Sequence, residues 1–300
     1  MFNLLFSKSG LSLERLRTFC EVSEAGSMAK AANGDTVRQS QFSRQMKDLE
    51  EHFGRKLTER RGRNVVLTKE GAEFAALARQ ILGALEDFHV TGSTSSVEIS
   101  VGAGESFYRG VLLPRLAQIT DRLPGVVLSL KNLRGIEIVE GLLDGRLDLG
   151  VVDENELSND LQYERLGKIS YRLVAQQKSI NPRGAKLMTW KSMISLPFVG
   201  MEGTNRVISA VEKMALEMGS KITFSVKCSS WLGVADVLAT QGGVGVLPSI
   251  IQIPDGCVAI NAPGLNVFDR SIVLAWDARR GTIRHQSIKC QRVLRDVLKL

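Results

Sequence analysis

Cysteine is scarce in this chain of 300 residues, and the cysteines present lie far apart. The four are Cys20, Cys228, Cys257 and Cys290, and no two of them form a CxxC pair. Zinc ribbons and thioredoxin-type centres need such a pair, and a disulfide scaffold needs a higher density of cysteines. The spacing argues against all three classes and fits a reducing compartment.

Long apolar runs and export signals are also missing. No stretch approaches the roughly 20 apolar residues that span a bilayer. The N-terminal MFNLLFSKSGLS has a short apolar patch, but it lacks a preceding basic region and a small-residue cleavage site, so we expect no secretory signal. We therefore expect a cytoplasmic protein without a membrane partner.

The motifs of common enzyme classes do not occur. His52, His89 and His285 lie far apart and form no HExxH or other metal-spaced cluster. Neither G-x-S-x-G nor GxxxxGK(S/T) is present, and GGVGV at 242–246 lacks the spacing of a dinucleotide loop. We expect no catalytic residues, no metal site and no cofactor.

Length and charge set the remaining bounds. Three hundred residues with 44% hydrophobic content predict two or three folding units with ample core. The formal net charge of +7 is compatible with a polyanionic partner, but many basic proteins bind no nucleic acid. The placement of the basic residues is therefore more informative than their total.

Residues 26–71 show the pattern of two short helices followed by a hairpin. Ser27 is placed to cap the first helix with its hydroxyl, and Asn33 and Gly34 end that helix because both tolerate a left-handed conformation. A second helix is expected to open near Gln39 or Ser40. Its buried stripe follows helical spacing at Phe42, Met46, Leu49 and Phe53.

The opposite face of this second helix is polar and basic near its start, where a recognition helix meets base edges and phosphates. Segment 57–67 predicts a hairpin whose tip carries Arg60, Arg61, Gly62 and Arg63. Residues 38–69 hold nine Lys or Arg against four Asp or Glu, which favours salt-dependent binding to phosphates. The alternatives are a solvated amphipathic face and a generic basic loop. Together the features describe a winged helix-turn-helix.

Residues 13–71 resemble the N-terminal domain of LysR-type transcriptional regulators. The residues that match at the family's spacing are Leu16, Phe19, Val22, Gly26, Ser27, Ala31, Ala32, Gln39, Ser43, Arg44, Gln45, Leu49, Glu50, Gly54, Leu57, Arg60, Leu67, Thr68 and Gly71. The chain departs from the family pattern at Asp35, Arg38, Ser40 and Thr58. These departures alter the entrance of the recognition helix and leave the fold intact.

Double-stranded DNA is therefore the expected partner of this domain. We expect groove contacts from Gln39, Ser40, Gln41, Ser43 and Arg44. Phosphate contacts are expected from Ser27, Lys47, Arg61 and Arg63.

After Thr68 the sequence predicts one long helix that runs to about residue 88. Apolar residues recur along it every three to four positions, at Phe74, Ala78, Ile81, Leu85 and Phe88. The resemblance implies that this helix pairs two subunits in a homodimer or homotetramer, and the alternative is a helix packed on its own domain. HVTGSTSS at 89–96 predicts a polar linker after it.

From residue 96 onward, strand and helix patterns alternate, which predicts a doubly wound α/β fold with parallel sheets. The pattern restarts with a shifted phase from Leu161, and a strand at 271–276 returns the chain to the first unit, so two lobes are expected. We expect a DNA-binding domain at 1–70, a linker helix and hinge at 71–95, and an effector domain at 96–300. Its lobe I would comprise 96–168 and 269–300, and lobe II would comprise 169–268.

This second half resembles the effector domain of the same family, a two-lobed fold like that of periplasmic solute-binding proteins. The matching motifs are Leu112-Leu113-Pro114, Leu123-Pro124, GLLDGRLDLGVV at 141–152, Leu196-Pro197-Phe198 and GGVGVLP at 242–248. A cleft between two such lobes presents helix N-termini to a small ligand. We expect a small-molecule effector there, in contact with Glu105, Ser106, Phe107, Gly135, Glu202, Thr204 and Ser230.

Glu105 and Glu202 fall on expected cleft loops, where the family more often has small or hydroxyl side chains. A pair of carboxylates would favour an amine or another cationic effector. The alternative is that both are rim residues paired with Arg109, Arg134 or Arg206.

The whole sequence thus predicts a transcriptional regulator that binds DNA and is controlled by a small-molecule effector. One rival is a solute-binding protein that uses the two-lobed half alone, and the first 70 residues speak against it. An enzyme on the same fold is the other rival, and the chain offers no nucleophile, metal or acid-base constellation for it.

Overall fold

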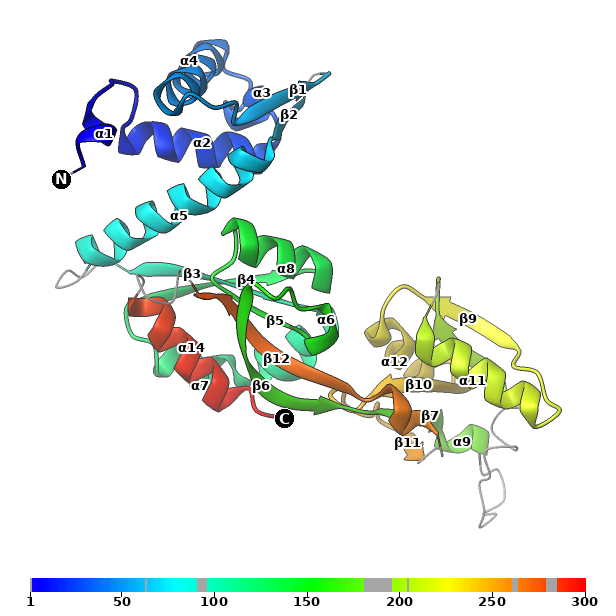
Figure 1. Cartoon of the computed structure of the whole chain (residues 1–300). Helices are drawn as coiled ribbons and strands as arrows, with labels where there is room; N and C mark the ends of the chain where they lie inside the picture. The colour runs from blue at the N-terminus through cyan, green and yellow to red at the C-terminus, as the bar shows by residue number, and fades with distance from the viewer. Residues whose placement is uncertain are drawn as a thin grey trace.

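The computed structural model describes residues 2–62, 64–90, 96–180, 196–203, 205–260, 264–278 and 285–300. They form an N-terminal helical domain with a hairpin, one long helix, and two α/β lobes that lie side by side (Figure 1). The long helix passes between the N-terminal domain and the first lobe, which is the middle body in Figure 1. The expected winged helix-turn-helix, linker helix and two-lobed domain are confirmed.

The N-terminal domain packs its helices around one apolar cluster. The elements are α1 (Asn3–Phe6), α2 (Leu13–Ala25), α3 (Met28–Ala31), α4 (Thr36–Phe53), β1 (Thr58–Arg61), β2 (Asn64–Leu67) and α5 (Lys69–Val90). The expected stripe of α4 is buried at Phe42, Met46 and Leu49, and Phe53 packs against the same cluster. Asn33 and Gly34 take positive φ angles of 51° and 80°, which confirms the left-handed conformation expected of them after α3.

Helix α4 begins earlier than the sequence pattern indicated. Its N-cap is Asp35, whose Oδ1 accepts hydrogen bonds from the Val37 amide at 2.8 Å and the Arg38 amide at 3.1 Å. The expected start near Gln39 was therefore wrong, because the carboxylate satisfies the free amides of a turn that lies further upstream. The expected side-chain cap at Ser27 was also wrong, since its hydroxyl makes no capping hydrogen bond to α3.

Two of the five residues assigned to a dimer seam lie instead in the core of their own domain. Phe74 packs edge-on to Phe19 with ring centroids 4.9 Å apart, and Ala78 is fully buried. Both face α2 because the first half of α5 closes the N-terminal domain. Ala78 is inaccessible to a partner subunit and Phe74 is partly buried, so at these two positions the helix packs on its own domain, which was the alternative considered.

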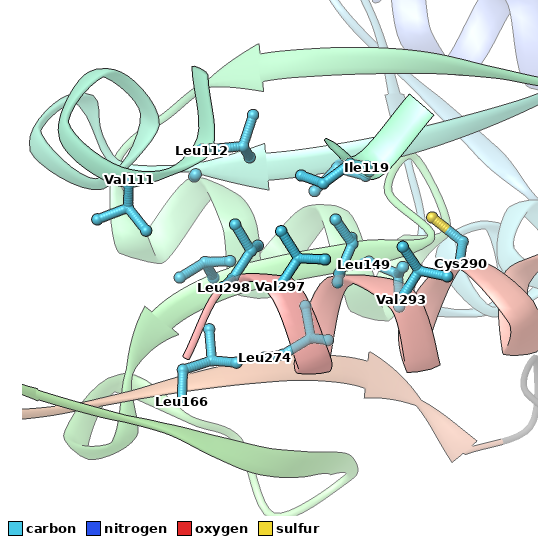
Figure 2. Packing of buried hydrophobic residues seen from close by; sticks show 14 of the residues in the cluster. Val111, Leu112, Ile119, Leu149, Leu166, Leu274, Cys290, Val293, Val297 and Leu298 are labelled. Carbon is cyan, nitrogen blue, oxygen red and sulfur yellow. The ribbon is translucent and has the colours of Figure 1, made fainter. Parts of the chain in front are cut away.

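Lobe I is built on the mixed sheet β4-β3-β5-β12-β6. Its elements are β3 (Val97–Ala103), α6 (Glu105–Phe107), η1 (Tyr108–Leu112), η2 (Leu113–Arg115), α7 (Leu116–Asp121), β4 (Val126–Asn132), α8 (Gly135–Asp144), β5 (Leu149–Asp153), η3 (Glu154–Glu156), β6 (Leu161–Ile169), β12 (Arg270–Asp277) and α14 (His285–Val297). Figure 2 shows Val293, Val297 and Leu298 reaching from the end of the chain into the core beside Leu149 and Leu274. Helix α8 covers the other face of the sheet through Ile138 and Leu142.

Lobe II is built on the mixed sheet β11-β7-β10-β8-β9. Its elements are β7 (Tyr171–Gln176), α9 (Gln177–Ile180), β8 (Phe198–Met201), α11 (Arg206–Glu217), β9 (Phe224–Cys228), α12 (Trp231–Thr240), β10 (Val244–Pro248), β11 (Cys257–Ile260) and η4 (Leu265–Phe268). Helices α11 and α12 cover opposite faces, since residues of α11 pack with Phe198 while residues of α12 pack with Val199, which points the other way along β8.

Neither sheet is purely parallel, so that part of the expectation was wrong. β12 runs antiparallel to β5 and β6, and β7 runs antiparallel to β10 and β11. The pairs β3-β4, β3-β5, β8-β9 and β8-β10 are parallel, as a doubly wound fold requires. The antiparallel strands flank the two chain crossings between the lobes, and the pattern of the sequence gave no sign of β6 or β11.

Candidate nucleic-acid interface and ligand cleft

The first half of α4 presents a polar and basic face to solvent. Gln39, Ser40, Gln41 and Arg44 are exposed, and Ser43 is half-buried. Lys47 is exposed one turn further on, and its Nζ lies 3.4 Å from Oε1 of Glu51. The five expected groove residues therefore lie together on the first half of α4, on the side that is open to solvent.

The hairpin β1-β2 stands beside α3 and α4 and projects from the N-terminal domain (Figure 1). Its four residue pairs run from Thr58↔Leu67 to Arg61↔Asn64, and Gly62 takes a φ of 65° at the turn. Arg61 is exposed near the tip. Arg63, which the sequence placed on phosphate, lies outside the described residues.

The base of the hairpin is fixed to α4 by Glu50. Its Oε1 accepts hydrogen bonds from the backbone amides of Leu57 and Thr58, both at 3.0 Å, and from the Thr58 hydroxyl at 3.1 Å. Its Oε2 lies 2.7 Å from the Lys56 ammonium. Partial burial would raise the pKa of Glu50, but these donors outweigh it and hold that pKa below its ordinary value. The carboxylate thereby sets the angle between α4 and the wing.

At the entrance of the surface, Ser27 is less accessible than its expected phosphate contact requires, and two residues without an assigned role lie beside it. Ser27 is only 8% exposed, because it lies at the packed junction of α2 and α3. Val37 is 77% exposed, and Arg38 stacks over the Phe42 ring at 5.3 Å. The sequence pattern began the helix after Val37 and Arg38 and so did not place them on this surface, and the signal that could have placed them is Asp35 as an N-cap.

A cleft of about 520 Å³ separates the lobes. Five of the seven residues expected to contact an effector line it: Glu105, Ser106, Phe107, Gly135 and Ser230. Glu202 is exposed and is not among the residues that line the cleft. Thr204 lies outside the described residues.

Arg270 forms an ion pair in the cleft with Asp153, which is the more enclosed of the two, with side-chain exposures of 40% and 9%. Its Nε donates to Asp153 Oδ2 at 2.5 Å, and its Nη2 lies 3.7 Å from Glu156 Oε1. Burial would lower the pKa of Arg270, but the bond to Asp153 and the nearby Tyr171 hydroxyl raise it. The guanidinium is therefore charged and already held by carboxylates.

The N-terminus of α8 forms a second part of the cleft wall. Glu137 accepts hydrogen bonds from the backbone amide of Arg134 at 2.9 Å and from its guanidinium at 3.2 Å, so Arg134 is paired with Glu137 rather than with Glu105 or Glu202. The bond from Arg134 holds the pKa of Glu137 below its ordinary value. A Cβ built on Gly135 would collide with the carboxylate of Glu156, which means that this carboxylate rests directly on the first turn of the helix.

Sequence reasoning did not find Asp153, Glu156, Tyr171 or Arg270 as lining residues. Asp153 ends strand β5, and polar residues at the carboxyl ends of strands are a recognised signal for ligand sites. Tyr171 and Arg270 gave no such signal, because they follow the two crossings between the lobes, and a cleft position there depends on the tertiary arrangement.

Within the described residues, no group of three or more His, Cys, Asp or Glu side chains is arranged to hold a metal ion. In the same part of the chain, no helix has the length and apolar content that a bilayer span requires.

The fold and these two surfaces define a class of protein, a transcriptional regulator that joins a DNA-binding domain to a domain for a small ligand. The profile of the LysR substrate binding domain matches residues 93–286, and that of the bacterial regulatory helix-turn-helix protein of the lysR family matches residues 13–72. The chain belongs to the LysR family of DNA-binding transcriptional regulators.

Relatives of the chain carry the same description. TfdS, an HTH-type transcriptional regulator of Cupriavidus pinatubonensis (strain JMP 134 / LMG 1197), is 27% identical over 84% of this chain and 85% of its own length. PecT of Dickeya dadantii (strain 3937), also an HTH-type transcriptional regulator, is 31% identical, but the match covers 48% of this chain and 46% of PecT.

Solved structures share the fold at low identity. Full-length OxyR from Pseudomonas aeruginosa, in a variant form, superimposes with a TM-score of 0.67 over 96% of this chain and 98% of its own, at 18% identity. Full-length CbnR in complex with its target DNA gives a TM-score of 0.54 over 94% of this chain and 99% of its own, at 22% identity.

Proposed function

We propose that this regulator reads duplex DNA with the exposed start of α4 and grips the backbone with the hairpin beside it. The observation that carries the proposal is the shared exposure of Gln39, Ser40, Gln41 and Arg44 on one helix end that buries its opposite face. Long polar and guanidinium donors match the acceptors of the major groove. Ser43 supports the same face, and Arg61 and Lys47 supply charge for phosphates.

We further propose that residues 1–70 are the DNA-binding domain, 71–95 the linker, and 96–300 the effector domain. Lobe I would hold 96–168 and 269–300, and lobe II 169–268. Strand pairing supports this division, because β6 and β12 join the lobe I sheet while β7 joins the lobe II sheet. A regulator of this family acts on the chromosome, which supports a cytoplasmic location and a role without catalysis.

The cleft favours an effector that carries an amine. Two guanidinium groups line it, those of Arg134 and Arg270, and four carboxylates line it, those of Glu105, Glu137, Asp153 and Glu156. The formal charge of the lining is therefore −2. Both guanidinium groups are paired with these carboxylates. A negative, partly enclosed cleft attracts a cation and repels a carboxylate.

Aromatic side chains in the cleft suit the apolar part of such an effector. Tyr171 and Trp231 both line it, with ring centroids 5.8 Å apart. Aromatic faces also attract cations within about 6 Å. We therefore propose a small amine with an apolar body, bound between Glu105 in lobe I and Trp231 in lobe II.

Gel retardation with a random duplex pool tests the DNA-binding surface. We expect retention that weakens steeply as salt rises, because each phosphate contact releases counterions. Arg44→Ala should weaken binding by about 1 to 3 kcal/mol without unfolding the domain. The matched control is Arg122→Ala, since Arg122 pairs with Asp296 on lobe I and shares only the change of charge. Normal affinity in a stable Arg44→Ala variant would remove Arg44 from the interface.

Benzylamine and benzoate test the effector class, because they share a ring and differ in the sign of their charge. We expect benzylamine to raise the melting temperature of the protein and benzoate to leave it unchanged. Glu105→Gln should abolish the shift, while Glu202→Gln, at an exposed residue outside the cleft lining, should retain it. Stabilisation by benzoate alone would contradict the proposed amine.

A further inference from the structure

Arg79 on α5 links the DNA-binding domain to lobe I through two hydrogen bonds. Its Nη1 donates to the backbone carbonyl of Asp144 at 2.6 Å, and its Nη2 donates to the Ser23 hydroxyl at 2.9 Å. Ser23 lies on α2, and its hydroxyl donates in turn to the Cys20 carbonyl at 2.8 Å, which leaves its lone pairs for Arg79. The guanidinium on α5 therefore contacts two further elements, α2 of the DNA-binding domain and α8 of lobe I.

The acceptor on lobe I is suited to a cation. Asp144 is the last residue of α8, where backbone carbonyls have no partner within the helix. The negative end of the helix dipole lies at the same place, so a guanidinium there is favoured by charge as well as by hydrogen bonding. A lysine could supply the charge but lacks the fork that reaches two acceptors at once.

The region around this contact is polar and loosely packed. A cavity of about 390 Å³ lies between the domains and is lined by Glu24 of α2, Arg79 and Glu86 of α5, and Lys131 and Arg146 of lobe I. The apolar cluster of the N-terminal domain shares no residue with those of lobe I. Although α5 lies against α8 and β3, no apolar cluster spans the two domains, so directional bonds such as those of Arg79 contribute to their relative orientation.

Helix α8 also reaches the effector cleft. Its first residue, Gly135, lines the cleft beneath the Glu156 carboxylate, and its last residue, Asp144, accepts the bond from Arg79. Ten helical residues span about 15 Å as one rigid rod. A shift of α8 at the cleft is therefore delivered directly to the guanidinium that holds the DNA-binding domain.

We propose that Arg79 is the positioning residue that orients the winged helix on lobe I, and that this orientation sets the spacing between the two DNA half-sites of a dimer. The inference rests on the proposed function, because it assumes that α4 reads DNA. Arg79 is half-buried between α2 and α8, so its removal should change the orientation of the DNA-binding domain and leave the exposed face of α4 intact.

The test begins with duplexes that the full-length wild-type protein selects from a random pool. One half-site is then moved relative to the other in single base-pair steps across one helical turn. We expect wild-type affinity to fall by about tenfold or more at an offset of half a turn, and that of Arg79→Ala to vary by less than about threefold. Affinity for an isolated half-site should be the same in both proteins.

Three further variants distinguish the loss of the two inter-domain hydrogen bonds from the loss of a positive charge and from a general loss of stability. Arg79→Lys should give a flat profile like Arg79→Ala, Ser23→Ala an intermediate one, and Arg122→Ala the sharp wild-type profile. A sharp profile in Arg79→Ala would overturn the role of Arg79. If Arg79→Ala loses isolated half-site binding, the Ser23→Ala profile decides, and a sharp profile there overturns the inference. A wild type that shows no salt-sensitive retention would instead refute the proposed function.

Discussion

At the scale of single residues, Glu50 makes stability depend on pH. Its pKa in the folded protein lies below the ordinary value of a glutamate, near 4.3, because four hydrogen bonds favour the carboxylate. Its stabilising contribution is therefore complete above that ordinary value and is lost as pH falls through the lower, folded-state pKa. Urea unfolding of the N-terminal domain between pH 3 and 7 measures this loss.

Glu50→Ala should remove the pH-dependent contribution and lower the free energy of unfolding by about 1 to 3 kcal/mol at pH 7, since two backbone amides lose their acceptor. The control is Glu51→Ala, because Glu51 is exposed and its ion pair with Lys47 is an i,i+4 contact on the helix surface. That change should stay within about 0.5 kcal/mol. Equal effects of the two substitutions would show that Glu50 does not anchor the wing.

At the scale of elements, Asp35 determines where the recognition helix begins. Asp35→Ala should cost about 1 kcal/mol, because the amides of Val37 and Arg38 lose their acceptor and the helix dipole loses an anion. Thermal unfolding measures the cost, and affinity for a selected duplex should fall as the first turn frays.

Asparagine provides the matched control at this position, since its amide oxygen accepts the same hydrogen bonds. Asp35→Asn should retain most of the stability that Asp35→Ala loses. If both variants unfold at the wild-type temperature, the early start of α4 does not depend on this cap.

At the scale of the whole molecule, the second half of α5 offers an apolar stripe to another subunit. Leu77 is 50% exposed, Ile81 39%, Leu85 44% and Phe88 82%, and their spacing of four, four and three places them on one face. Since Phe74 and Ala78 are occupied in the core, we expect subunits to pair through this stripe.

Phe88→Asp should weaken self-association at least about tenfold, because covering a phenylalanine contributes about 1.5 to 3 kcal/mol and a charge there opposes burial. Sedimentation equilibrium measures the association. Val267→Asp is the control, since Val267 is 73% exposed on lobe II and the substitution introduces the same negative charge at an exposed apolar side chain. Unaltered association of the Phe88→Asp variant would place the subunit contact elsewhere.

Local patterns predicted much of the fold because they depend on neighbouring residues. The stripe from Phe42 to Leu49 specifies a buried helix face, and Gly62 permits the turn of the hairpin. The start of α4 was misplaced because Asp35 was read as a departure from the family rather than as a cap. The burial of Phe74 could not be inferred from spacing, since a helical stripe looks the same whether it meets its own domain or a second subunit.

The sequence by itself determined the winged helix, the linker helix and the two-lobed class of fold, because helical spacing, capping and turn residues act over a few positions. Only the tertiary structure decided the charge of the cleft and the link between the domains. Arg270 and Asp153 are 117 positions apart and Arg79 and Asp144 are 65 apart, so no local pattern records that they meet. Their contacts exist because the chain crosses twice between the lobes and because α5 lies against α8.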